Sequence, residues 1–271
     1  MIGRKMLKTD RFPGGKHFAV TFSYDDGDKA DRRLVEIFNR YGMKATFNLI
    51  PSRFDGETVV SSGEVSSLYA GHEIACHTYS HPHLERLPLT GQVREISLCR
   101  AALEQLSGGI VRGMATPYGG KNSDTVAAMN ALGIAYCRNA GSTGTLSLPS
   151  DFLDWTPSCH HTGAPAVIEK FKTQWADQPG CYGGVLYIWG HSFEFDRADN
   201  WELAEQICSS LAGIDDVWFA TNIEIYDYVA AQRALLMSAD GSIVYNPSIA
   251  DVWASCGGET VCIKGGETIK L

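Results

Sequence analysis

The sequence predicts an α/β protein in which one parallel sheet closes into a barrel, and three observations support this fold class. Short apolar runs alternate with amphipathic segments seven times along the chain. Alternation of this kind favours a parallel sheet, and this number of units usually closes into a barrel. The chain has 271 residues, of which 44% are hydrophobic and 20% charged. That length and composition suffice for one large domain with a sizeable core.

The strands are expected where short runs of apolar residues are bounded by turn residues or helical segments. These runs lie at residues 17–23, 45–50, 72–76, 110–115, 134–138, 183–189 and 216–220. Because most of the runs lack a polar alternation, we expect strands that are buried on both faces.

Amphipathic segments between these runs predict the helices. In the first, over about 28–41, Leu34, Ile37 and Phe38 share one face. A long helix is expected to begin at a Thr90 cap. The next helix has Asn122 or Ser123 as its cap and ends at Gly133. Further helices are expected at about 165–176, 200–212 and 222–235.

The pattern of the sequence changes after residue 236. Gly-rich turns separate short β-type runs there, without a helical period. We therefore expect one α/β domain over residues 1–236 and a small β-rich extension over 237–271.

Charge and cysteine usage limit the classes of partner and location. The formal charge of −8 argues against nucleic acid and anionic membranes, which favour clustered Lys and Arg. Eight cysteines are scattered without a C-x-x-C pair, as is typical of reduced thiols. Neither a signal peptide nor a transmembrane span is expected from the sequence. These observations predict a cytoplasmic protein.

Candidate catalytic residues fall at the C-terminal ends of the strands, where functional residues of (β/α) barrels lie. Asp25 and Asp26 end the first strand, and His77 and His81 follow the third. The i, i+4 spacing of the histidines places both imidazoles on one side of a helical turn. An Asp-Asp-Gly turn or a surface histidine pair is also common in structural roles. Two imidazoles with one carboxylate, however, predict a catalytic metal site with open positions.

These motifs and three later ones resemble, in type and order, those of the polysaccharide deacetylases, the NodB-homology domain of carbohydrate esterase family four. The motifs are Tyr24-Asp25-Asp26-Gly27, His77-Thr78-Tyr79-Ser80-His81, Thr116-Pro117-Tyr118-Gly119, Asp154-Trp155 and His191. The resemblance covers residues 17–235. It implies a distorted (β/α)7 barrel and the hydrolytic removal of acetyl groups, usually from N-acetylated sugars.

The resemblance also implies roles for individual residues. Asp26, His77 and His81 hold one divalent metal ion, with zinc expected first and cobalt, nickel or manganese as alternatives. Asp25 is the base that acts on a metal-bound water, and His191 is the acid that protonates the leaving amine. This division of labour agrees with general chemistry, since a metal lowers the pKa of water to about 7 and an imidazole can donate a proton near neutral pH.

The same resemblance assigns the surroundings of the reacting groups. The backbone N–H of Tyr118, in the turn that Pro117 begins, stabilises the oxyanion. Trp155 lines the acetyl pocket, and Asp154 orients His191. His161 and Trp189 lie at the same edge of the barrel, and we expect them to bind substrate as well. Glu194 is expected to be a solvated loop charge.

The chain departs from the family pattern at three places, one of which is Ser192-Phe193-Glu194 after His191 where the family usually has an Asp. Ala115 stands where the family has an Arg that pairs with the catalytic Asp, and Trp189 stands where it has a Leu. We predict that Arg138, at the end of the neighbouring strand, supplies the missing guanidinium to Asp25. Arg112 is excluded because its separation from position 115 turns it to the opposite face of the strand.

The sequence thus predicts a metal-dependent hydrolase that removes acetyl groups from N-acetylated or O-acetylated saccharides. A hydrolase of non-sugar amides on the same scaffold is an alternative. A non-catalytic carbohydrate-binding protein is another, although binding alone needs neither the base Asp25 nor the acid His191. We expect a short saccharide or small amide as the substrate.

Overall fold

A curled parallel sheet forms the centre of the computed structural model, which describes residues 6–177 and 183–271. Its strands follow the order β6-β5-β4-β3-β2-β8-β7, and β9 pairs with β2. The bounds are β2 (Phe18–Asp25), β3 (Ala45–Leu49), β4 (Glu73–Cys76), β5 (Gly113–Ala115), β6 (Tyr136–Arg138), β7 (Cys159–His160), β8 (Gly184–His191) and β9 (Val217–Phe219). This is the distorted (β/α) barrel that the sequence predicts.

The seven expected strands are all present, and one further strand joins them. β7 has only two residues, too few to give a hydrophobic pattern. The segment that contains it connects the two edges of the sheet, because Trp155 bridges to Arg138 of β6 while Cys159 pairs with Ile188 of β8. This short segment therefore draws the open sheet into a barrel.

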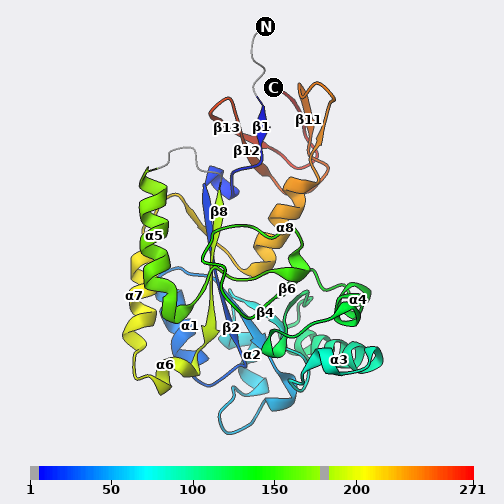
Figure 1. The fold of residues 1–271 in the computed structure, drawn as a ribbon, viewed down its shortest axis with the longest axis vertical. Coiled ribbons are helices and arrows are strands. Elements are labelled where there is room, and N and C mark those ends of the chain that lie inside the picture. Colours follow the sequence, from blue (N-terminus) through cyan, green and yellow to red (C-terminus); the bar gives the residue numbers. More distant parts are fainter. Residues whose placement is uncertain (1–5, 178–182) are drawn as a thin grey trace.

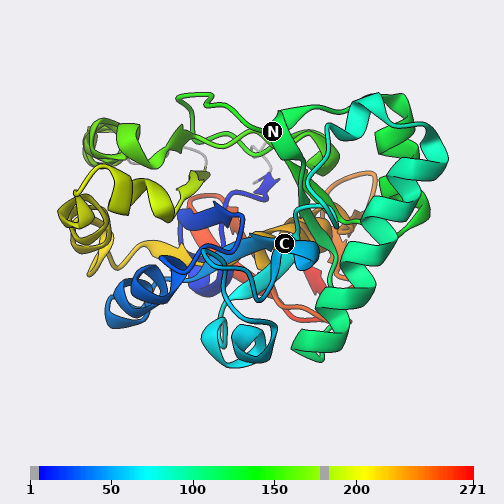
Figure 2. The same ribbon diagram turned by 90° about the horizontal axis from the view of Figure 1, so that it is seen from below.

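Helices surround the sheet on the outside (Figures 1 and 2). They are α1 (Asp31–Arg40), α2 (Val65–Leu68), α3 (Leu89–Ser107), α4 (Ser123–Ala131), α5 (Ala164–Asp177), α6 (Phe193–Arg197), α7 (Trp201–Leu211) and α8 (Asn222–Arg233). The Asn122 cap is confirmed, since its side chain accepts a hydrogen bond from the Thr125 N–H at 2.9 Å. The expected Thr90 cap is wrong: Pro88 precedes the first turn of α3, and Thr90 lies within that turn.

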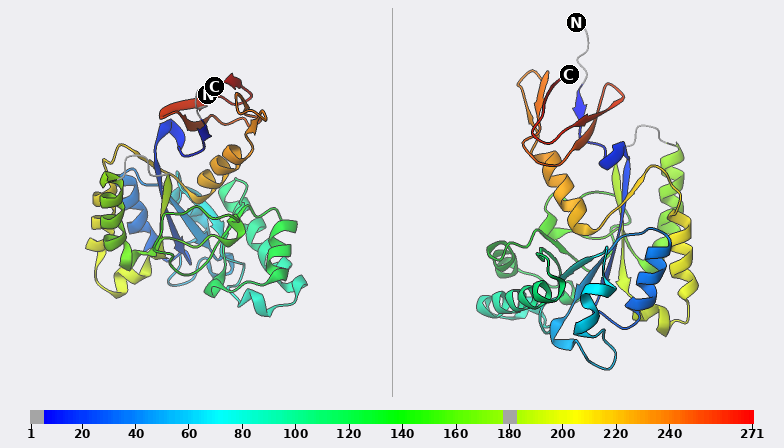
Figure 3. Two further views of the ribbon diagram at one scale, coloured as in Figure 1. Left: turned by 45° about the horizontal axis from the view of Figure 1, so that its top comes forward. Right: turned by 180° about the vertical axis from the view of Figure 1, so that it is seen from behind.

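Two small antiparallel sheets lie at the opposite end of the molecule from the carboxyl ends of β2 and β8 (Figures 1 and 3). One contains β1 (Leu7–Lys8), β12 (Val252–Cys256) and β13 (Glu259–Ile263); the other contains β10 (Leu236–Met237), β11 (Ile243–Tyr245) and β14 (Thr268–Lys270). The expected β structure after residue 236 is therefore present, and the N-terminal β1 joins it. Whether this extension is a separate domain stays a prediction.

The core is built from the buried faces of the sheet and helices. Phe22 and Phe38 pack with ring centroids 4.8 Å apart, and Phe47 and Tyr69 with centroids 4.6 Å apart. Each such side chain contributes about 1.5–3 kcal/mol on burial. The seven cysteines among the described residues form no disulfide, and Cys181 lies outside them. Within the described part of the chain, no helix combines the length and apolarity that crossing a membrane requires.

Candidate active site

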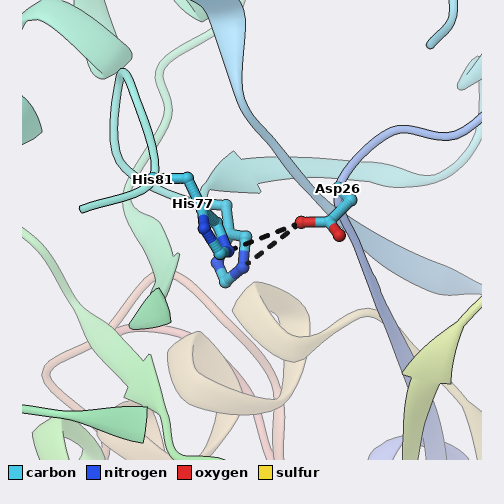
Figure 4. Close-up of side chains that lie close together, drawn as sticks. All are labelled: Asp26, His77 and His81. Atoms are coloured by element: carbon cyan, nitrogen blue, oxygen red, sulfur yellow. Dashed lines mark ion pairs between the residues drawn. The ribbon is translucent and has the colours of Figure 1, made fainter. Parts of the chain in front are cut away.

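Asp26, His77 and His81 converge at the carboxyl ends of β2 and β4 (Figure 4). Oδ1 of Asp26 lies 3.7 Å from Nε2 of His77 and 3.6 Å from Nε2 of His81. Zinc bonds of about 2.0–2.2 Å to nitrogen and oxygen ligands place neighbouring ligands somewhat more than 3 Å apart. The three side chains are therefore close enough to hold one ion.

Hydrogen bonds in this cluster leave lone pairs available to a cation. Nδ1 of His77 lies 2.9 Å from the carbonyl oxygen of Ala115, so the proton resides on Nδ1 and the lone pair on Nε2 faces Asp26. Oδ1 of Asp26 is buried and accepts no hydrogen bond from the described residues. A buried carboxylate oxygen without a partner is costly unless a cation binds it. Two imidazoles and a carboxylate suit a first-row divalent ion.

The His77–His81 segment is a strained loop and not the helical turn that the spacing suggests. Thr78 and His81 have φ of 61° and 64°, and the N–H of His81 donates to Oγ1 of Thr78 at 3.0 Å. Asp26 and Tyr118 also have positive φ, 79° and 58°. Non-glycine residues rarely adopt this conformation, and it concentrates at functional sites. The turn, and not helical periodicity, brings the two imidazoles together.

Asp25 forms a buried ion pair with Arg138, as predicted. Nη2 of Arg138 donates to Oδ2 of Asp25, and Nδ2 of Asn48 donates to Oδ1 at 2.9 Å. Asp25 and Arg138 are only 2% and 1% exposed. Burial raises the pKa of Asp25, but the charges of Arg138, His77 and His191 outweigh burial and lower it below its usual value. The carboxylate is therefore held ionised beside the metal-ligand cluster.

The position of Arg138 follows from the register of β5 and β6. Arg138 is the direct register neighbour of Ala115. The Trp189 ring covers the guanidinium at 4.6 Å. Arg112 instead pairs with Asp227 on the surface at 2.6 Å. The pairing prediction is confirmed, whereas a catalytic role for Arg138 stays a prediction.

His191 contacts Glu194, and not Asp154. Nδ1 of His191 lies 3.3 Å from Oε1 of Glu194, and its Nε2 lies 4.0 Å from Oδ2 of Asp25. Burial lowers the pKa of His191, but Glu194 and the charges of Asp25 and Asp26 outweigh burial and raise it. Asp154 is mostly exposed and pairs with Lys121 at 2.5 Å. The expected orienting role of Asp154 is therefore wrong, and so is the expectation that Glu194 is only a solvated charge.

A cavity of about 270 Å³ joins these groups. Its walls are Asp25, Asp26, His77, His81, Thr116, Tyr118, Arg138, Ala140, Trp189 and His191. The metal-ligand candidates, the Asp25–Arg138 pair and His191 thus face one space. Tyr118 and Trp189 both line the cavity, as expected. Tyr118 lies at its rim and is 61% exposed.

Three residues expected to bind substrate do not line this cavity. Trp155 is buried in an aromatic cluster with Tyr136, Phe152 and Tyr187, because its backbone bridges to β6 and turns the indole into the core. His161 is buried, and burial lowers its pKa to about 4. Pro117 is buried at the start of its 3₁₀ turn. These three assignments are corrected, because none of the three residues lines the cavity.

Sequence reasoning missed Asn48, Arg53 and Glu194 as parts of the site. Asn48 donates to Asp25, and Nη1 of Arg53 lies 3.9 Å from Oδ1 of Asp26. Asn48 had a usable signal, since it is a polar residue inside the second apolar run. Arg53 and Glu194 lie in turns after strand ends, where charged residues are common, so their roles require the three-dimensional arrangement.

The fold and the site together define a distorted (β/α) barrel with a candidate divalent-metal site at the carboxyl ends of its strands. Residues 13–137 match the family model for polysaccharide deacetylases. A chitin deacetylase from Pestalotiopsis sp. is 31% identical over 121 residues, which are 43% of this chain and 39% of that protein. Over these residues the chain is similar to the polysaccharide deacetylases.

Solved structures support the same fold at low sequence identity. A protein from Mycobacterium smegmatis named as a polysaccharide deacetylase matches with a TM-score of 0.64 and 19% identity, covering 82% of this chain and 93% of that one. A family 4 acetyl xylan esterase from Clostridium thermocellum, in complex with a cobalt ion, matches with a TM-score of 0.55 and 17% identity, covering 77% and 90%. The chain spans about two fifths or less of the curated relatives it matches.

Proposed function

We propose that this protein is a metal-dependent hydrolase that removes acetyl groups from N-acetylated or O-acetylated saccharides. The observation that carries the proposal is the shared cavity of about 270 Å³. It brings a His–His–Asp cluster, a buried ionised carboxylate and a histidine of raised pKa to one space. A ligand-binding site alone requires neither a base nor an acid, whereas amide hydrolysis requires both.

One divalent ion, for which zinc is the first choice, is proposed to bind to Asp26, His77 and His81. Cobalt, nickel and manganese are alternatives, and the cobalt ion in the Clostridium thermocellum esterase supports this range. When bound, such an ion polarises the carbonyl of the substrate and lowers the pKa of water. The His77 imidazole is oriented for this role by Ala115, through the contact at Nδ1.

The remaining polar groups are proposed to move protons and to stabilise charge. Oδ2 of Asp25 accepts the proton of the attacking water, since the carboxylate is ionised and fixed by Arg138 and Asn48. Nε2 of His191 donates a proton to the leaving nitrogen of an amide or the leaving oxygen of an ester, and Glu194 supports its protonated form. The backbone N–H of Tyr118 stabilises the developing oxyanion from the cavity rim.

The substrate class follows from the cavity and from the relatives. A volume of about 270 Å³ fits an acyl group and part of one sugar ring, since pockets for whole drug-sized ligands start near 300 Å³. The Pestalotiopsis relative is a chitin deacetylase by name, which supports an N-acetylated saccharide as the substrate. We propose short saccharides as substrates, and the cytoplasmic location expected from the sequence stays a prediction.

Acetate release from a matched panel tests the proposal. The zinc-loaded protein is incubated with N-acetylated chitooligosaccharides, O-acetylated xylooligosaccharides and N-acetylated non-sugar amides. We expect acetate from the acetylated saccharides. Acetate from the non-sugar amides alone would replace the proposal by the alternative hydrolase, and release from none of them would contradict it.

Glu194→Gln is expected to shift the alkaline limb of the pH–rate profile. Glu194 helps to raise the pKa of His191, so its loss lowers that pKa. An acid works only while it is protonated, and activity therefore begins to fall at a lower pH in the variant. The profile of kcat/KM measures this shift. Asp154→Asn is the matched control. The Asp154 carboxylate is far more exposed and pairs with Lys121, so its loss should leave the alkaline limb in place.

A further inference from the structure

A second group of potential metal ligands lies beside His191. His160, His161 and Glu194 each offer one ligand atom, and these atoms lie within 4.8 Å of one another. Oε2 of Glu194 is 2.9 Å from Nε2 of His160 and 3.3 Å from Nε2 of His161. Ligands of one tetrahedral zinc ion lie about 3.3 Å apart, given bonds of about 2.0–2.1 Å. The separation of 3.3 Å matches ligands that share an ion, and the 2.9 Å contact needs to widen by only a few tenths of an ångström to do so.

The fold holds these ligands in place. β7 pairs in parallel with β8, so that His160 is the register partner of Trp189 and lies next to the strand that ends at His191. The short helix α6 then directs Glu194 back toward β7. None of these residues is close to the others in the sequence except the His160–His161 pair, so the cluster depends on the barrel closure.

His161 is fixed more firmly than a loop histidine would be. Its ring stacks on Phe195 at 4.3 Å and on Tyr24 at 5.9 Å. A Cβ at position 190 would lie 2.1 Å from Nδ1 of His161, so Gly190 is required for the ring to sit against the backbone of β8. The imidazole is thus positioned before any ion binds, which reduces the entropy cost of binding.

The cluster is reachable from solvent. The side chains of His160 and Glu194 are 26% and 32% exposed, whereas that of His161 is 2% exposed. A site with one buried and two accessible ligands admits an ion and leaves further positions for water. Two imidazoles and one carboxylate suit zinc or another first-row divalent ion.

We propose that His160, His161 and Glu194 form a second divalent-cation site, separate from the Asp26–His77–His81 cluster. Its occupation has a consequence that rests on the proposed function. Oε1 of Glu194 faces Nδ1 of His191 at 3.3 Å, while Oε2 faces the two imidazoles. A cation on Oε2 draws the Glu194 carboxylate toward the two imidazoles and so disturbs its contact with the His191 ring. Excess zinc is therefore expected to inhibit the enzyme reversibly.

Zinc stoichiometry tests the site without any assay of activity. The metal-stripped protein is dialysed against increasing zinc and its metal content is measured by inductively coupled plasma mass spectrometry. Two equivalents are expected for the wild type and one for His160→Gln. Glu194→Gln serves as a second variant with the same expectation. His17→Gln is the matched control: His17 also contacts a carboxylate, that of Asp216 at 2.5 Å, but the pair includes no second imidazole.

The outcomes separate this inference from the proposed function. Two equivalents in the wild type and in His17→Gln, with one in His160→Gln, support the second site. A wild type that binds one equivalent, lost in His81→Ala and retained in His160→Gln, overturns the second site and leaves the proposed function intact. A single equivalent lost only in His160→Gln supports the second site and contradicts the first. Zinc inhibition that persists unchanged in His160→Gln overturns the inhibitory role.

Discussion

Asp25→Asn is expected to lower kcat/KM by about two to four orders of magnitude, the usual contribution of a general base. The amide cannot accept a proton from the attacking water, whereas Asn48 can still contact the side chain. Asp25 is not among the proposed metal ligands, so the first equivalent of zinc should stay bound. Steady-state kinetics of acetate release, together with the metal content, measure both effects.

Two results would contradict this role for Asp25. An unchanged kcat/KM in a folded, zinc-loaded variant would exclude it as the base. Loss of zinc together with activity would assign it to the metal instead. Because the variant leaves Arg138 buried without its charge partner, circular dichroism and thermal unfolding must first show that the fold is retained.

Arg138→Ala is expected to lower kcat/KM and to move the acid limb of the pH–rate profile to higher pH. The guanidinium helps to hold the pKa of Asp25 below its usual value against the effect of burial. Without it, that pKa rises, so Asp25 becomes protonated and inactive as a base at a higher pH. Loss of one partner from a buried pair also costs about 3–5 kcal/mol of stability, which thermal unfolding should detect.

Matched variants separate the role of Arg138 from a general effect of charge. Arg112→Ala removes a guanidinium that pairs with Asp227 at the surface, and it should leave the acid limb in place. Arg138→Lys keeps a positive charge but loses the planar guanidinium with its paired donors. We therefore expect its kcat/KM and the pH of its acid limb to lie between those of the wild type and of Arg138→Ala. An acid limb unchanged in a folded Arg138→Ala variant would show that Asp25 does not depend on this arginine.

The parts of the site that could be predicted from the sequence are those set by strand register. Asp25, Asp26 and His77 come directly at strand ends, so the parallel sheet places them at one edge. Arg138 could be inferred in the same way, because the neighbouring strand brings it beside Ala115. The strands themselves were visible as apolar runs, since both of their faces are buried.

Residues in the loops could not be assigned in this way. The position of His81 depends on positive φ at Thr78 and His81, which spacing does not reveal. Asp154 and Glu194 are both carboxylates in turns, and only the path of the chain after β8 shows that Glu194 is the one beside His191. Trp155 was expected in the cavity, but the barrel closure turns its ring into the core.

Restoration of acetate release by zinc tests the central claim most directly. The metal-stripped wild type is assayed on an N-acetylated chitooligosaccharide before and after one equivalent of zinc, beside His77→Ala and His81→Ala. The account predicts that the stripped protein is inactive, that one equivalent restores release in the wild type, and that neither variant recovers at that equivalent. Full release by the stripped protein, or full zinc occupancy and activity in a protein lacking both imidazoles, would contradict it.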